Sequence, residues 1–177
     1  MMRLFVAIRP PKPVREQLLL LMTGVRSARW QDDSQLHLTL RFIGEVDHNR
    51  AEDIGMMLES IRFPKFEIAL ESVGMFERNG RRSALWAGIA MSEPLTRLQH
   101  KIENGLQRLG LEPEHRGFLP HITLARLNSS TGPTDDFLAD HAALTGPAFP
   151  VDHFDLIESR LGSKGARYES LARYWLD

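Results

Sequence analysis

The feature that most constrains this chain is a four-residue pattern that occurs twice. His37-Leu38-Thr39-Leu40 returns 84 residues later as His121-Ile122-Thr123-Leu124. Each copy alternates polar and apolar residues, and successive side chains of a β-strand point to opposite faces of the sheet. Each copy therefore predicts a strand that buries one apolar face and presents a histidine and a threonine side by side on the other.

The predicted elements around the two motifs follow one another in the same order. Residues 3–76 predict strand, helix, motif strand, helix and strand, and residues 84–159 predict this series again at offsets of about 81 to 84 residues. Apolar residues at helical spacing predict helices over residues 13–27, 47–61, 92–110 and 135–144. We therefore expect an internal duplication within one bilobal domain, residues 1–177, in which both motif strands face a shared groove.

Composition limits what such a chain can do. Its 177 residues, 42% of them hydrophobic, suit one domain with a sizeable core. The absence of cysteine excludes a disulfide framework, a thiolate nucleophile and a thiolate metal site. The formal net charge of −1 excludes a globally basic nucleic-acid binder but leaves room for a local basic cleft. No apolar run has transmembrane length and no signal-peptide pattern begins the chain, so we expect a cytoplasmic monomer that binds no membrane.

Two His-x-Thr-x motifs in a duplicated chain of this length resemble the two-histidine phosphoesterase superfamily, and within it the RNA 2′,3′-cyclic phosphodiesterases, also called 2′-5′ RNA ligases. The sequences around the motifs and near the C-terminus agree with this family: residues 3–8, 36–44 and 118–126, together with Ser159, Leu161, Gly165 and Tyr168. The resemblance implies an α+β fold of two lobes, with mainly antiparallel sheets flanking a central groove and helices on the outer faces.

The resemblance also implies an activity. It implies that the chain hydrolyses the 2′,3′-cyclic phosphate at an RNA end to a 2′-phosphomonoester, without a metal or a cofactor. It further implies a reversible, ATP-independent ligation of RNA ends, notably those of tRNA halves, through a 2′-5′ linkage. RNA with a 2′,3′-cyclic phosphate end is therefore the expected partner.

The residue types of the motifs suit this chemistry. Opening a cyclic phosphodiester requires one group that removes a proton from the incoming water and another that gives a proton to the leaving oxygen. Two histidines can do both near neutral pH, because imidazole titrates near about 6.5. Thr39 and Thr123 can donate hydrogen bonds to the nonbridging oxygens, where negative charge develops. The residues alone leave open which histidine is the acid and which is the base.

The resemblance assigns His37 as the proton donor to O3′ and His121 as the proton acceptor from water. Arg126 follows the second motif closely and is our candidate for binding the phosphate. It lies an odd number of residues from His121, so an ideal strand would turn its side chain away from the groove. We therefore expect a bulge or a strand end if Arg126 binds the substrate. The aromatic residues Trp30 and Phe42 are expected in the core.

Other functions stay open on the sequence alone. A metal-dependent phosphodiesterase would use the two histidines as ligands, but no Asp or Glu accompanies either motif, so we expect no metal site. A non-catalytic RNA-binding module would not require both histidines and both threonines. A related enzyme could act on small cyclic nucleotides or on ADP-ribose cyclic phosphate. The basic turn over residues 78–82 predicts a solvated hairpin tip, with RNA phosphates as an alternative partner.

Overall fold

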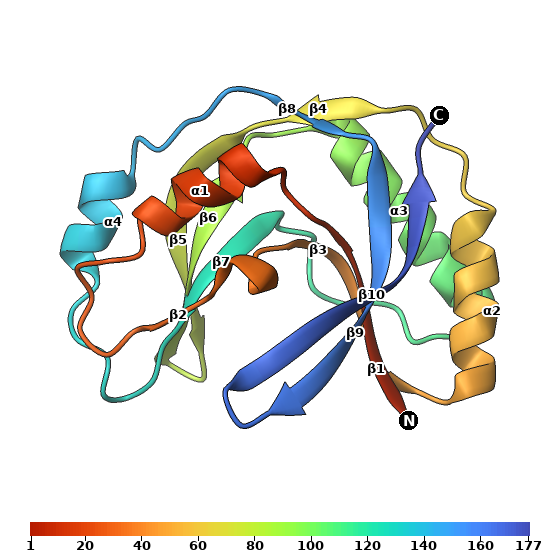
Figure 1. Ribbon diagram of the computed structural model, residues 1–177, viewed down its shortest axis with the longest axis horizontal. Coiled ribbons are helices and arrows are strands. Elements are labelled where there is room, and N and C mark those ends of the chain that lie inside the picture. The colour runs from red at the N-terminus through yellow and green to blue at the C-terminus, as the bar shows by residue number, and fades with distance from the viewer.

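A single antiparallel sheet of eight strands runs through the whole molecule. The computed structural model describes residues 1–177, and its strand order is β10-β9-β1-β3-β7-β6-β5, with β2 added beside β7 (Figure 1). These strands are β1 (Met2–Ile8), β2 (Arg29–Trp30), β3 (Leu38–Val46), β5 (Leu70–Arg78), β6 (Arg81–Ile89), β7 (His121–Arg126), β9 (His153–Gly162) and β10 (Gly165–Trp175). A second, two-stranded sheet pairs β4 (Phe66–Ile68) with β8 (Phe149–Val151).

The expected α+β architecture with two lobes and mainly antiparallel sheets is confirmed. One lobe contains β1, β3, β9 and β10, the other contains β2, β5, β6 and β7, and the lobes meet where β3 pairs with β7. The helices are α1 (Lys12–Leu20), α2 (His48–Glu59), α3 (Glu93–Arg108) and α4 (Asp135–His141), with a short 3-10 helix η1 (Asp33–Gln35) before β3. None of the helices is long and apolar enough to span a lipid bilayer.

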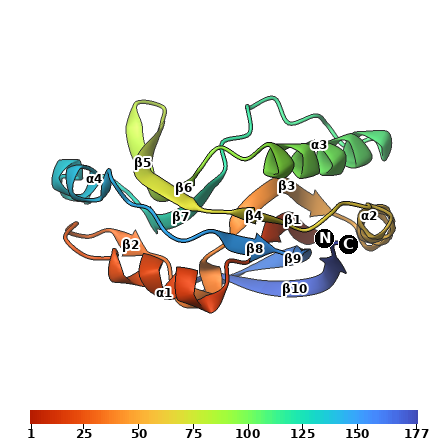
Figure 2. The same cartoon turned by 90° about the horizontal axis from the view of Figure 1, so that it is seen from above.

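The two halves of the chain exchange helices between the lobes. Helices α2 and α3 pack against each other and cover the lobe of β1, β3, β9 and β10, whereas α1 and α4 lie over the other lobe (Figures 1 and 2). Each half of the chain therefore contributes one helix to each lobe. Strand β5 comes from the first half and lies beside β6 of the second, and β9 comes from the second half and lies beside β1 of the first. We propose that this exchange arose with the duplication that the two motifs indicate.

Local sequence explains most helix boundaries. Asp47 caps α2, since its carboxylate accepts from the backbone N–H of Arg50 at 2.8 Å, and Ser92 caps α3 in the same way. The expected first helix, residues 13–27, is wrong in its second half: α1 ends at Leu20. The reason is the backbone at Gly24 and Ser27, which has positive φ values of 82° and 59° and turns the chain toward β2.

The apolar faces of both motifs lie in the main core. Leu38, Leu40, Ile122 and Leu124 are all at most 2% exposed. Helix α3 covers part of this face with side chains three or four residues apart that are fully buried: Leu95, Leu98, Ile102 and Leu106. Burying the apolar side chains of a motif strand leaves its histidine and threonine no position except the opposite face.

Candidate active site

One residue pair aligns the two motifs at the centre of the molecule. Leu38 of β3 lies opposite Ile122 of β7. In an antiparallel pair, the positions on either side of such a pair also face one another. Each flanking pair then joins a histidine to a threonine, namely Thr39 with His121 and His37 with Thr123. Cross-strand neighbours of this kind have Cβ atoms about 4.5 to 5.5 Å apart, so the four polar side chains form one cluster.

A groove with a volume of about 610 Å³ opens over this cluster. His37, Thr39, Thr123 and Arg126 line it together with side chains from β1, β2, η1 and the β9–β10 hairpin. His121 does not line the cavity itself. Its ring packs beside the groove against Phe76 and Trp86, with ring centres 4.7 and 6.1 Å away.

His121 is held in one tautomer. Its Nδ1 lies 2.7 Å from the carbonyl oxygen of Leu119, and a carbonyl can only accept, so this hydrogen bond assigns the proton to Nδ1. The other nitrogen, Nε2, is then an unprotonated acceptor. Burial lowers the pKa of His121, and the positive charge of Arg126 lowers it further against the opposing effect of the Leu119 carbonyl. The neutral imidazole is therefore favoured at neutral pH.

His37 lies in a different setting. Its Nδ1 is buried without a hydrogen-bond partner, so Nε2 is the nitrogen that can reach a ligand in the groove. The rings of Phe5 and Tyr168 pack against the imidazole edge to face, with centres 6.1 and 5.6 Å away. Burial lowers the pKa of His37 to about 4; the backbone carbonyl of Gln35 opposes this shift, and the charge of nearby Arg9 adds to it.

Arg126 lies on the groove face because β7 contains a bulge. Thr123 pairs with Trp86 and Ala125 pairs with Leu85, so Leu124 is an extra residue without a partner on β6. The bulge shifts the alternation of side chains by one residue, so the side chain of Arg126 lies on the same face of β7 as His121. The geometric condition that the sequence imposed on Arg126 is therefore met, while its contact with phosphate stays a prediction.

The first motif has the same irregularity. Thr39 pairs with Ala7 and Arg41 with Val6, which leaves Leu40 as the extra residue of β3. Phe42 thereby occupies the position that corresponds to Arg126. The expectation that Phe42 belongs to the core is wrong, because the side chain lines the groove and is 44% exposed. Trp30 also lines the groove, but its ring is half-buried and packs against the main core, with 5.7 Å between its centre and that of Phe137.

The groove is cationic although the whole chain is not. Its lining includes Arg3, Arg29, Arg126 and Lys164 but no carboxylate, and none of these four side chains forms an ion pair. Arg3 stacks over Phe42, with 5.2 Å between the guanidinium carbon and the ring centre. This charge suits an anionic ligand. No three His, Asp or Glu side chains converge as metal ligands anywhere in the chain.

The buried His37 predicts a pH dependence of stability. The unfolded chain binds a proton at His37 below its ordinary pKa of 6.5, whereas the folded chain does so only near pH 4. The unfolded state therefore holds more protons between these values, and the free energy of unfolding should fall as pH is lowered from 6.5 to 4, by up to about 1.4 kcal/mol per pH unit. Urea unfolding of the wild type and of His37→Gln over this range measures the difference in slope.

His48→Gln is the matched control for this measurement, because His48 lies exposed on α2. That variant should keep the wild-type slope. Equal slopes in the wild type and His37→Gln would show that the imidazole of His37 is not held neutral by the fold.

The fold and the paired motifs place the chain in the class of two-histidine phosphoesterases. The chain belongs to the 2′-5′ RNA ligase superfamily, whose family model matches residues 11–162. Relatives named RNA 2′,3′-cyclic phosphodiesterase cover nearly all of it. The protein from Archaeoglobus fulgidus is 30% identical over 173 residues, which is 96% of this chain and 98% of the relative. The Escherichia coli protein is 31% identical and covers 98% of this chain and 96% of its own length.

Solved structures agree with this assignment. The crystal structure of TT0787 from Thermus thermophilus matches with a TM-score of 0.80 and 26% identity, over 98% of this chain and 97% of that one. The E. coli LigT structure complexed with 3′-AMP also has a TM-score of 0.80, with 28% identity over 99% of this chain and 98% of that chain. The whole fold is thus shared with proteins of this family.

Proposed function

We propose that this protein hydrolyses RNA 2′,3′-cyclic phosphate ends to 2′-phosphomonoesters by acid–base catalysis with two histidines. One observation carries the proposal: Leu38 lies opposite Ile122, which sets the two motifs side by side at a groove lined by His37, Thr39 and Thr123, with His121 packed at its edge, and the charged side chains of this groove are all cationic. The names of the relatives support the choice of substrate. A cyclic phosphodiester suits this site, because it is an anion and because its opening requires one acid and one base.

In the proposed reaction His121 accepts a proton from water at Nε2. The water oxygen attacks phosphorus, the bond from phosphorus to O3′ breaks, and O3′ takes a proton from His37. The product keeps its phosphate on O2′, and the two histidines end with their protonation states exchanged. The hydrogen bond from His121 Nδ1 to Leu119 supports this assignment, because it leaves Nε2 free to accept.

His37 must be protonated to act as the donor, although burial favours its neutral form in the free protein. A phosphate anion bound beside the ring favours the imidazolium and raises the pKa. Substrate binding would therefore create the acid that the reaction uses. Thr39 and Thr123 would donate hydrogen bonds to the nonbridging oxygens, and Arg126 would pair with the phosphate.

The same groove would support ligation. A 5′-hydroxyl of a second RNA end would replace water at His121, and the new bond would be a 2′-5′ phosphodiester. No nucleotide cofactor would be required, because the strained cyclic phosphate already carries the free energy of the bond. RNA ends such as those of tRNA halves have both the cyclic phosphate and the 5′-hydroxyl that this reaction joins.

Product analysis tests the proposal most directly. An oligonucleotide with a 2′,3′-cyclic phosphate end is incubated with the protein in the presence and absence of EDTA, and the terminal phosphate is located by NMR. We expect a 2′-phosphate, formed at the same rate in both samples. A 3′-phosphate product would contradict the assignment of His37 to O3′, and activity lost in EDTA and restored by a metal would contradict the acid–base mechanism.

A further inference from the structure

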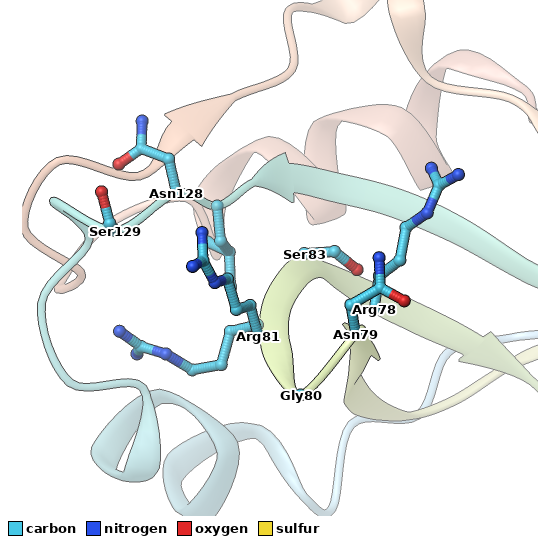
Figure 3. A pocket seen from close by; sticks show the side chains of 9 residues that line it. Arg78, Asn79, Gly80, Arg81, Ser83, Asn128 and Ser129 are labelled. Carbon is cyan, nitrogen blue, oxygen red and sulfur yellow. The ribbon is translucent and has the colours of Figure 1, made fainter.

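The tip of the β5–β6 hairpin carries a basic surface that the proposed reaction does not use. Asn79 and Gly80 form the two-residue turn, and both have positive φ, 53° and 74°, as a type I′ turn requires. Arg78 and Arg81 flank the turn directly opposite each other. Figure 3 shows these two side chains diverging from the turn, with Arg81 on the side of Asn128 and Ser129.

Two positive side chains thus leave neighbouring positions of the hairpin. Like charges that face each other across a strand pair destabilise it. Neither Arg78 nor Arg81 forms an ion pair with any carboxylate of the chain. An anion bound between or beside the two guanidinium groups would remove the repulsion.

The hairpin tip is held in a fixed position. Arg82 donates to the carbonyl oxygens of Gly132 and Thr131 at 2.7 and 2.8 Å, which fastens the tip to the loop that follows β7. Between the tip and that loop lies a pocket of about 890 Å³, and Leu127 is the one hydrophobic residue that lines it. The three arginines in its lining, Arg78, Arg81 and Arg82, suit an anionic ligand.

The pocket and the groove are lined by consecutive residues at the end of β7. Arg126 lines the groove, and the next three residues, 127–129, line the pocket at the hairpin tip. Ala84 of the hairpin pairs with Arg126, and the backbone N–H of Leu127 donates to the carbonyl of Ser83 at 3.0 Å. A strand with its terminal phosphate at Arg126 would therefore have its next charges near the hairpin.

We propose that Arg78 and Arg81 bind the phosphodiester backbone of the RNA strand whose cyclic end occupies the groove. The inference rests on the proposed function and extends it, since it predicts a preference for oligonucleotides over mononucleotides. The contacts go to phosphates, so they select for chain length and not for base sequence. Lysine should replace arginine at both positions with little loss, because the release of counterions from the phosphates depends on positive charge, which lysine keeps.

The test compares two substrates in one double variant. In R78Q/R81Q, the kcat/KM for an oligonucleotide with a 2′,3′-cyclic end should fall by about 10-fold, mainly through KM, while that for a 2′,3′-cyclic mononucleotide stays at the wild-type value. The slope of log affinity against log salt, measured with a 2′-phosphate-ended oligonucleotide, should shrink by roughly 1 to 1.5, as expected for two lost single-strand phosphate contacts. R78K/R81K should restore both.

R97Q/R108Q is the matched control, because it removes the same charge from exposed positions of α3 that line neither pocket. An unchanged kcat/KM for the oligonucleotide in R78Q/R81Q would overturn the inference, and so would an equal loss for both substrates. If the wild type opens neither substrate, the proposed function fails instead. In that case the salt-dependent affinity for the 2′-phosphate-ended oligonucleotide, measured by fluorescence anisotropy, still decides whether the hairpin binds RNA.

Discussion

Replacing His121 with alanine should lower turnover of a 2′,3′-cyclic phosphate substrate by about 10² to 10⁴-fold, the usual contribution of a general acid or base. Replacing His37 should cause a loss of the same order. Neither histidine belongs to the apolar core, although both rings pack against aromatic side chains: His121 begins β7, and His37 immediately precedes β3. Both variants should therefore fold, and circular dichroism with thermal unfolding would show this.

The pH–rate profile distinguishes the roles of the two histidines. The wild type should show a bell, because one histidine must be neutral and the other protonated in the complex. The two limbs belong to the coupled pair and not to single residues. Loss of His121 should remove the acidic limb and loss of His37 the basic limb, because each variant leaves only one titrating member of the pair. Near-normal turnover in either alanine variant, or a monotonic wild-type profile, would contradict the two-histidine mechanism.

Replacing Thr39 or Thr123 with valine should lower turnover by about 10- to 10³-fold, the order of losing one donor to a developing oxyanion. Valine keeps the β-branched shape that suits the strand and removes only the hydroxyl. Each threonine lies across from one histidine, so each variant should lose a contact to the phosphate without disturbing the apolar pair of Leu38 and Ile122.

The threonine variants also have a signature that distinguishes them from damage to the fold. A hydroxyl does not titrate in this range, so the pH–rate bell should keep its limbs and fall only in height. Thr96→Val is a suitable control, because Thr96 is exposed on α3, far from both motifs in the sequence. Unchanged rates in both motif variants would remove the threonines from the site.

Much of the site could be predicted from the paired motifs, because the alternation of side chains between the two faces of a strand depends only on the local sequence. Alternation alone assigns His37 and Thr39 to one face and Leu38 to the other, and the structure has them so. What alternation cannot give is the bulge at Leu124, because that depends on how β6 pairs with β7. The position of Arg126 was therefore conditional, and the position of Phe42 was predicted wrongly for the same reason.

The sequence could not predict which histidine is the acid and which is the base, because this also depends on contacts between segments far apart in the chain. The two motifs read almost identically, whereas the environments of the two imidazoles differ. The contact of His121 with the carbonyl of Leu119 and the unpartnered Nδ1 of His37 come from residues outside the motifs and from packing across strands. The 3-10 helix and the short strand β2 were missed too, since β2 exists only through its pairing with Arg126 and Ala125.

The exchange of helices and strands between the lobes has a consequence for how the molecule is made and how it can change. A fragment that ends at the β5–β6 turn would contain α1 without β6 and β7 of its lobe, and β3 without α3. A ribosome must therefore deliver the chain as far as α4, residue 141, before the lobe of His121 is complete, and as far as β10, residue 175, before the lobe of His37 is complete. For the same reason, we expect that neither half of the chain alone would hold its histidine in place, because each histidine stands on a framework supplied partly by the other half.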